Sequence, residues 1–145
     1  MKFNRSPEIL VVDDDPEMRM LVEMAVSSGG FEVLSCGDGD TALELALTHR
    51  ADIVVLDVVL PGSLDGLAVC RRLKVELPGC FVIMLSGRSL DSDLADAERA
   101  GADAYFVKPV SLLELGALIE TILPKPGEPP RFTKSARLSL RHYAG

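Results

Sequence analysis

The segment "EILVVDDDPEMR", residues 8–19, runs from a short apolar stretch through three consecutive aspartates to a proline. A short run rich in β-branched residues is typical of a strand buried on both faces of a sheet. Pro16 suits the first turn of a helix, and apolar residues recur at helical spacing behind it. The segment therefore predicts a buried strand, an acidic turn and a helix. Adjacent carboxylates repel one another, so Asp13, Asp14 and Asp15 must stay in water or meet a neutralising partner.

The order of strand and helix continues along the chain. Short apolar runs predict strands at residues 8–12, 31–35, 52–56, 81–85 and 104–107. Helical spacing predicts helices that begin near residues 16, 41, 67, 91 and 111. Thr41 with Glu44, and Ser111 with Glu114, have the spacing of a capping box. Five strands alternating with five helices predict an α/β fold, in which a parallel sheet carries helices on both faces.

Length and charge predict one folded domain with a tail. The chain has 145 residues, enough for a single core, and 48% of them are apolar. Residues 1–123 carry 10 basic and 21 acidic side chains, whereas residues 124–145 carry 5 basic and 1 acidic. We therefore expect a domain over 1–123 and a Pro-rich linker with a basic tail over 124–145. An acidic body argues against a nucleic-acid-binding surface, which needs clustered Lys and Arg.

The basic tail has three interpretations. It opens with "PKPGEPP", residues 124–130, which is typical of a stiff extended linker, and we expect a flexible terminus beyond it. Phe132, Leu138 and Leu140 are apolar residues spaced among basic ones, as in a segment that docks a partner. The third interpretation is that the tail folds back on the acidic body.

Two features predict a cytoplasmic protein without a membrane partner. The most apolar run, "DIVVLDVVL" at residues 52–60, is too short to span a membrane, and the N-terminus lacks the apolar segment of a signal peptide. Cys36, Cys70 and Cys80 have no close spacing that indicates a zinc or redox site. We interpret them as small buried residues in a reducing compartment.

Polar side chains follow four of the predicted strands. In a parallel α/β sheet, ligands bind beyond the carboxyl ends of the strands. Clustered carboxylates there need a cation, and oxygen ligands favour a hard ion such as Mg²⁺. The strand ends carry Asp13 and Asp14, Asp57, Ser86 and Lys108.

Asp57 stands alone at the end of its strand and is the candidate nucleophile. A carboxylate that attacks a phosphoryl group forms an aspartyl phosphate, whose charge the metal and Lys108 would neutralise. Ser86 would donate a hydrogen bond to a phosphoryl oxygen. Taken singly, these residues have ordinary explanations: Asp15 suits a helix cap, Ser86 a turn, and a lone lysine is usually solvated. Their joint position at one edge favours the chemical interpretation.

Five short motifs in order lead to a family resemblance. "VVDDDPEMR", "VVLDVVLP", "DG", "MLSG" and "AYFVKP" together resemble the response-regulator receiver domain of bacterial two-component signalling, over about residues 7–123. The resemblance implies a doubly wound (βα)5 flavodoxin-like fold with five parallel strands in the order 2-1-3-4-5. It implies these roles: Asp13 and Asp14 as the acidic metal-binding pair, Asp57 as phosphoacceptor and metal ligand, the main-chain carbonyl of Val59 as a further metal ligand, Ser86 as the switch hydroxyl, Tyr105 as the aromatic rotamer switch, and Lys108 as the phosphate-contacting lysine before a cis Pro109.

The resemblance also implies a function. A receiver accepts a phosphoryl group from a histidine kinase or histidine phosphotransfer protein, with Mg²⁺, and signals to a downstream protein target. We therefore expect a signalling module that catalyses only its own phosphotransfer and autodephosphorylation, without direct DNA binding. Three forms stay open: a stand-alone receiver, a fragment of a larger regulator or hybrid kinase, and an unphosphorylated docking module.

Two other classes fit the sequence less well. A phosphatase with an aspartate nucleophile would need a second acid close to it, but Val58 and Val59 follow Asp57. A flavodoxin-like cofactor carrier would need a phosphate-binding loop after the first strand, where this chain has three acids that would repel phosphate.

The sequence departs from the family pattern near Asp57. The segment "LPGSLDG", residues 60–66, is about one residue longer than the commonest form, so we expect a reshaped loop. Val59 is apolar where many members carry a polar side chain, and Arg88 lies two residues past Ser86. We hypothesise slow dephosphorylation, because Val59 cannot orient an attacking water and Arg88 would shield or pair with the phosphoryl group. The alternative is that neither residue affects the rate.

Overall fold

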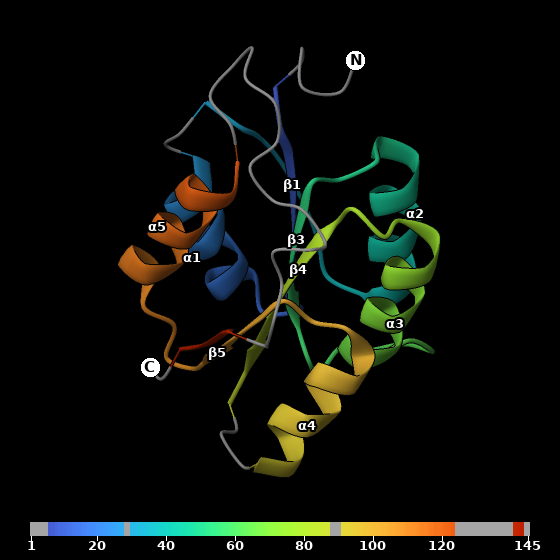
Figure 1. Cartoon of the computed structure of the whole chain (residues 1–145). Helices are drawn as coiled ribbons and strands as arrows, with labels where there is room; N and C mark the ends of the chain where they lie inside the picture. Colours follow the sequence, from blue (N-terminus) through green and yellow to red (C-terminus); the bar gives the residue numbers. More distant parts are fainter. Residues whose placement is uncertain (1–5, 28–29, 88–90, 124–140, 144–145) are drawn as a thin grey trace.

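A computed structural model describes residues 6–27, 30–87, 91–123 and 141–143 (Figure 1). Strands and helices alternate from the first strand to the fifth helix, as the sequence predicts. Within the described ranges, no helix has the length and apolar character needed to cross a membrane. The strands are β1 (Glu8–Val12), β2 (Glu32–Cys36), β3 (Ile53–Asp57), β4 (Phe81–Ser86), β5 (Ala104–Val107) and β6 (Arg141–Tyr143), and the helices are α1 (Pro16–Val26), α2 (Gly39–His49), α3 (Gly66–Glu76), α4 (Asp91–Ala100) and α5 (Leu112–Ile122).

The strands form one parallel sheet between two helical layers. Its order is β2-β1-β3-β4-β5-β6, which contains the predicted order 2-1-3-4-5. Along β1, Ile9 and Val11 belong to the core shared with α1 and α5, whereas Leu10 and Val12 belong to the core shared with α2, α3 and α4. Successive residues of a strand point to opposite faces, so one continuous apolar strand serves both cores. Figure 1 shows α1 and α5 on one side of the sheet and α2 and α3 on the other.

A short sixth strand extends the five predicted ones. Residues 141–143 form β6, which pairs in parallel with β5 and places His142 opposite Tyr105 in the register. The sequence does not predict this strand, because three residues carry too little strand pattern to be recognised without the edge that they pair with. Of the three interpretations of the tail, the pairing of β6 agrees with the one in which the tail folds back on the body. The candidate docking residues of the tail lie outside the described residues: Phe132, Leu138 and Leu140.

The start of α2 also differs from the prediction. The helix begins at Gly39, and Asp38 caps it by accepting hydrogen bonds from the amide of Thr41 at 2.7 Å and from its hydroxyl at 2.9 Å. These bonds, the amide first, lower the pKa of the Asp38 carboxyl group. The predicted capping box at Thr41 is therefore wrong, because a better acceptor lies three residues upstream. At α5, Ser111 accepts from the amide of Glu114 at 3.3 Å, as predicted.

A buried ion pair joins α3 to the amino edge of the sheet, which lies opposite the carboxyl ends of the strands. Lys74 Nζ lies 2.9 Å from Asp103 Oδ2 and donates to the carbonyl of Cys80 at 2.7 Å. The same Asp103 oxygen accepts from the amide of Val82 at 2.8 Å. The Asp103 side chain is fully buried, so its charge depends on these donors.

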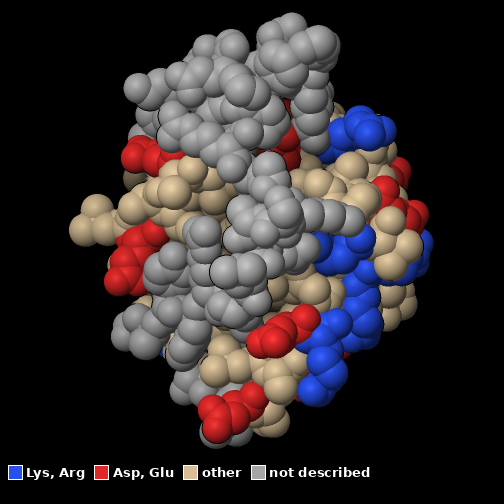
Figure 2. All heavy atoms as spheres, in the orientation of Figure 1, with Lys and Arg blue, Asp and Glu red and all other residues tan. Residues whose placement is uncertain are grey.

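Exposed charges of both signs cover the helices. Figure 2 shows Lys and Arg gathered on the α3 and α4 side of one face, with Asp and Glu among them. Arg72 pairs with Glu76 on α3 at 2.8 Å, and Arg99 pairs with Asp96 on α4. Exposed pairs along a helix contribute little to stability.

The two kinds of ion pair on α3 predict different costs of substitution. Lys74→Met leaves the buried Asp103 carboxylate without its lysine and should lower the free energy of unfolding by about 3 kcal/mol. Arg72→Met, on the same helix, should change it by less than about 0.5 kcal/mol. Urea unfolding monitored by circular dichroism measures both variants. Equal losses would contradict the assignment of the Lys74–Asp103 pair as a structural tie.

Candidate functional site

Three carboxylates meet at the carboxyl edge of the sheet. Asp13 follows β1 and Asp57 ends β3, and these strands are neighbours. One oxygen from each of Asp13, Asp14 and Asp57 lies within 4.8 Å of the others. Asp13 and Asp57 are buried, whereas Asp14 is exposed. Asp15, the third acid of the run, caps α1 by accepting from the amide of Glu17 at 3.0 Å.

Asp13 lies in an unfavourable electrostatic environment. Burial is the main cause that raises the pKa of its carboxyl group, and the charges of Asp57 and Asp14 raise it further. The amide of Asp15, 2.9 Å from Oδ1, and the charge of Lys108 oppose this rise without cancelling it. Oδ2 is buried and has no hydrogen-bond partner among the described residues, and Lys108 Nζ is 3.6 Å away. A divalent cation would neutralise this oxygen, so the residues present fit the predicted Mg²⁺.

Lys108 brings positive charge to the same edge. Its Nζ donates to Asp57 Oδ2 at 2.8 Å. Burial lowers the pKa of Lys108, but the hydrogen bond to Asp57 and the charges of Asp57 and Asp13 outweigh burial, so the pKa is raised and the ammonium stays charged. The amide of Lys108 donates to the carbonyl of Ser86 at 2.7 Å, and the bond between Lys108 and Pro109 is cis, as the resemblance implies.

Hydrogen bonds and close packing fix the main chain around Asp57. The amide of Val59 donates to Asp57 Oδ1 at 3.2 Å, and that of Val58 donates to the carbonyl of Leu85 at 2.9 Å. Gly66, the first residue of α3, donates to the carbonyl of Val58 at 2.9 Å. A Cβ atom at Gly66 would lie 2.1 Å from the carbonyl oxygen of Asp57. Only glycine permits this approach, which explains the Asp-Gly pair in the sequence.

The longer loop after β3 is tied to α2. Ser63 donates to the carboxylate of Asp40 at 3.0 Å. Gly62 turns the chain with a φ of +93°, in the left-handed region that favours glycine. At the start of this segment the side chain of Val59 is 74% exposed. Arg88 lies outside the described residues, so its role stays a prediction.

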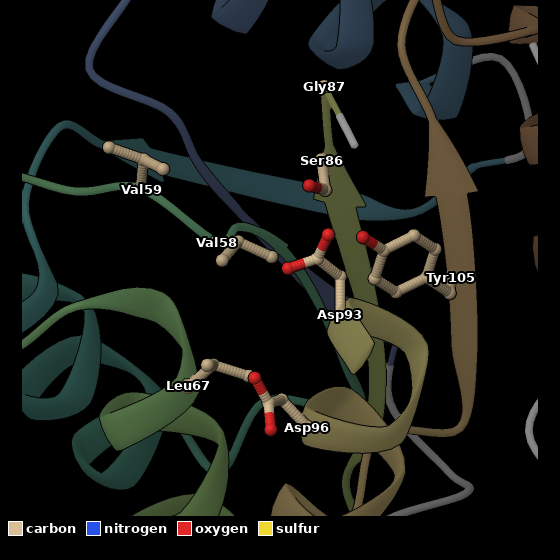
Figure 3. A pocket seen from close by; sticks show the side chains of 8 residues that line it. All are labelled: Val58, Val59, Leu67, Ser86, Gly87, Asp93, Asp96 and Tyr105. Carbon is tan, nitrogen blue, oxygen red and sulfur yellow. The ribbon is translucent and has the colours of Figure 1, made fainter. Parts of the chain in front are cut away.

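A pocket of about 390 Å³ opens next to Val58 and Val59, the two residues that follow Asp57 (Figure 3). Val58 and Val59 line it on one side, and Ser86 and Tyr105 line it on the other. Ser86 ends β4, Tyr105 lies on the neighbouring β5, and both residues are buried. The two predicted switch residues therefore share one cavity beside the candidate nucleophile.

Comparison with known proteins gives the family. A family model described as the response regulator receiver domain matches residues 9–120. The chain belongs to the response-regulator receiver family. This receiver is 37% identical over 119 residues to the probable transcriptional regulatory protein TcrX of Mycobacterium tuberculosis, covering 82% of this chain and 50% of TcrX. It spans about half the length of the curated relatives that it matches.

Solved structures agree with the fold of the receiver. The response regulator DrrB of Thermotoga maritima matches with a TM-score of 0.75 and 31% identity, covering 82% of this chain and 53% of DrrB. The BeF3-activated receiver domain of DrrB matches with a TM-score of 0.72 and 31% identity, covering 80% of this chain and 96% of that domain. The receiver identity and the flavodoxin-like fold predicted from the motifs are therefore confirmed.

Arg19 is a site residue that sequence reasoning missed. From α1, its Nη1 donates to the main-chain carbonyl of Asp13 at 2.8 Å. This bond fixes the backbone of the acidic turn from which Asp13 and Asp14 project. The signal in the sequence is its place in the second turn of α1, from which a long side chain reaches back over the N-terminal end of the helix.

We expect the protein to become more stable when the charge of Asp13 is removed. Without Mg²⁺, Asp13→Asn should raise the free energy of unfolding by about 1 kcal/mol, because it relieves a buried charge. The folded pKa of Asp13 lies above its usual value of 3.8, so the folded protein takes up this proton at a higher pH than the unfolded chain does. Lowering the pH through that range should therefore reduce the difference in the free energy of unfolding between the wild type and Asp13→Asn.

Urea unfolding in EDTA and in Mg²⁺ measures this effect. Mg²⁺ should stabilise the wild type and not Asp13→Asn. Glu44→Gln, a neutralised acid on the exposed face of α2, is the matched control and should leave both values unchanged. A destabilised Asp13→Asn in EDTA would contradict the electrostatic description of the site.

Proposed function

We propose that this receiver is a phosphorylation-dependent switch that accepts a phosphoryl group on Asp57 from a histidine kinase or histidine phosphotransfer protein. The observation that carries the proposal is the ammonium of Lys108, 2.8 Å from the Asp57 carboxylate and beside the buried Asp13. A nucleophile, a fixed counter-charge and candidate metal ligands thus lie at one edge of the sheet. Phosphoryl transfer depends on this combination of positioning and charge neutralisation.

Mg²⁺ is the cofactor in this proposal. Asp13, Asp14 and Asp57 would hold it, with the main-chain carbonyl of Val59 as a further ligand. When bound, the ion would neutralise charge on the phosphoryl oxygens.

Asp57, Lys108 and Ser86 each have a separate role in the phosphoryl transfer. A carboxylate oxygen of Asp57 forms a bond to phosphorus while the bond from phosphorus to the donor histidine nitrogen breaks, and that electron pair returns to the imidazole. Lys108 stays protonated and pairs with the charge that arrives on the phosphoryl oxygens. Ser86 donates its hydroxyl to one of those oxygens.

The switch follows from the pocket that Ser86 and Tyr105 share. A phosphoryl group on Asp57 draws Ser86 inward and leaves space that the Tyr105 ring fills. The face formed by α4, β5 and α5 changes in consequence, as a population shift between two packings. In the structure, β6 pairs with β5 at this face.

The output of the switch is a contact with a downstream protein in the cytoplasm, without direct binding to DNA or membrane. The chemistry of this chain is limited to its own phosphotransfer and autodephosphorylation. The matched segment covers only about half of the curated relatives, which include proteins named as transcriptional regulators, so a receiver within a longer regulator is a second form of the proposal.

Intact mass spectrometry after incubation with acetyl phosphate tests the proposal. The wild type should gain one phosphoryl group in Mg²⁺ and none in EDTA, and Asp57→Ala should gain none. Asp91→Ala, which removes an exposed acid at the start of α4, should load like the wild type. No gain in the wild type, either with acetyl phosphate or with a phosphorylated histidine phosphotransfer protein, would favour an unphosphorylated docking module.

The lifetime of the phosphoryl group tests the role of Val59. An apolar side chain cannot orient water, so Val59→Asn should speed dephosphorylation several-fold. Val75→Asn, at an equally exposed valine on α3, should leave the rate unchanged. Loss of the mass gain is followed over time after acetyl phosphate is removed. A wild-type lifetime of seconds that Val59→Asn does not shorten would contradict the hypothesis of slow dephosphorylation.

A further inference from the structure

The pocket beside the phosphoacceptor segment contains an acid that the proposed transfer does not use. Asp93 lies in the first turn of α4 and lines the pocket with Ser86 and Tyr105. Figure 3 shows its carboxylate among the side chains of Val58, Ser86 and Tyr105 rather than directed away from the cavity. Helix α4 therefore places a negatively charged side chain in the pocket that Ser86 and Tyr105 share.

Asp93 Oδ2 is inaccessible to solvent, and no hydrogen-bond donor among the described residues compensates its charge. Asp96, one turn further along α4, lines the same pocket but pairs with Arg99. Lys108 pairs with Asp57 and Asp13. Asp93 is thus the uncompensated acid of the pair that α4 turns toward the pocket.

Phosphorylation of Asp57 would make the electrostatic environment of Asp93 less favourable. An aspartyl phosphate carries more negative charge than the carboxylate that it replaces, and like charges at short range repel. Val58 and Val59, which follow Asp57 directly, line the pocket together with Asp93, and apolar walls screen charge less than water does. Ser86, which would otherwise present its hydroxyl to this cavity, is drawn to the phosphoryl group in the proposed switch.

We propose that Asp93 is the positioning residue that transmits phosphorylation of Asp57 to α4 by charge repulsion. The inference rests on the proposed function and deepens it. The new charge on Asp57 displaces the first turn of α4 through Asp93 and widens the space that Ser86 leaves for the Tyr105 ring. The same repulsion opposes phosphorylation, so neutralising Asp93 makes the phosphorylated state easier to reach and weakens the response of α4.

Neutral variants of Asp93 test both consequences. Asp93→Asn and Asp93→Ser should reach half-maximal phosphorylation at a roughly threefold to tenfold lower acetyl phosphate concentration than the wild type, the size expected for one charge interaction near a protein surface. In beryllofluoride and Mg²⁺, the amide chemical shifts of α4 should change less in these variants than in the wild type, as measured by two-dimensional NMR.

Two further variants separate charge from structure. Asp93→Glu keeps the charge and should restore the wild-type values in both measurements. If Asp93 acted only through packing, Asn would restore these values and Glu would not, because asparagine matches aspartate in shape and glutamate does not. Asp96→Asn, whose charge is already paired, should behave like the wild type. Neutral variants that load and respond like the wild type, or a Glu variant that behaves like Asn, would overturn the inference. A wild type that takes up no phosphoryl group would instead overturn the proposed function.

Discussion

Negative charge gathered at the carboxyl edge of the sheet is the constraint on which the site depends. Asp13 and Asp57 are buried on neighbouring strands, and the single ammonium of Lys108 reaches both. Burial is the main cause that raises the pKa of Asp13, and the charges of Asp57 and Asp14, which the one ammonium of Lys108 does not cancel, raise it further. The site is therefore less stable than it would be with neutral side chains, and a bound cation or a change of charge acts on an arrangement that is already strained electrostatically.

The fold supplies rigid supports for this unfavourable arrangement. Gly66 lets α3 approach the carbonyl of Asp57, and Arg19 holds the carbonyl of Asp13 from α1. The amide of Lys108 donates to the carbonyl of Ser86, and the amide of Val58 donates to the carbonyl of Leu85. Main-chain hydrogen bonds thus join the segments that carry Lys108, Ser86 and Asp57 along the sheet edge. Each support uses main-chain atoms, which explains how the carboxylates keep their positions while their charges repel.

The sequence predicts the strands and the site together, because the same pattern carries both. A buried strand of a parallel sheet is a continuous apolar run, and its last residue marks the binding edge. Cys70 and Cys80 are buried as expected, since they occur within apolar patterns, whereas Cys36, at the end of the edge strand β2, is only half-buried. What the sequence does not reveal depends on tertiary contacts: the Asp38 cap of α2, the β6 pairing, and the reach of Lys74 to Asp103. Arg19 belongs to the same group, because its partner is a carbonyl that no pattern displays.

The two edges of the sheet differ in how closely a lysine approaches the buried acid. At the amino edge, Lys74 lies 2.9 Å from Asp103 Oδ2, which also accepts from a main-chain amide at 2.8 Å, so a change there would mainly destabilise the fold. At the carboxyl edge, Lys108 lies 3.6 Å from Asp13 Oδ2 and donates to Asp57 at 2.8 Å, so two buried acids share one ammonium. A new charge at this edge therefore acts on acids that are only partly neutralised. In the proposed switch, these are the groups that would respond to a phosphoryl group on Asp57.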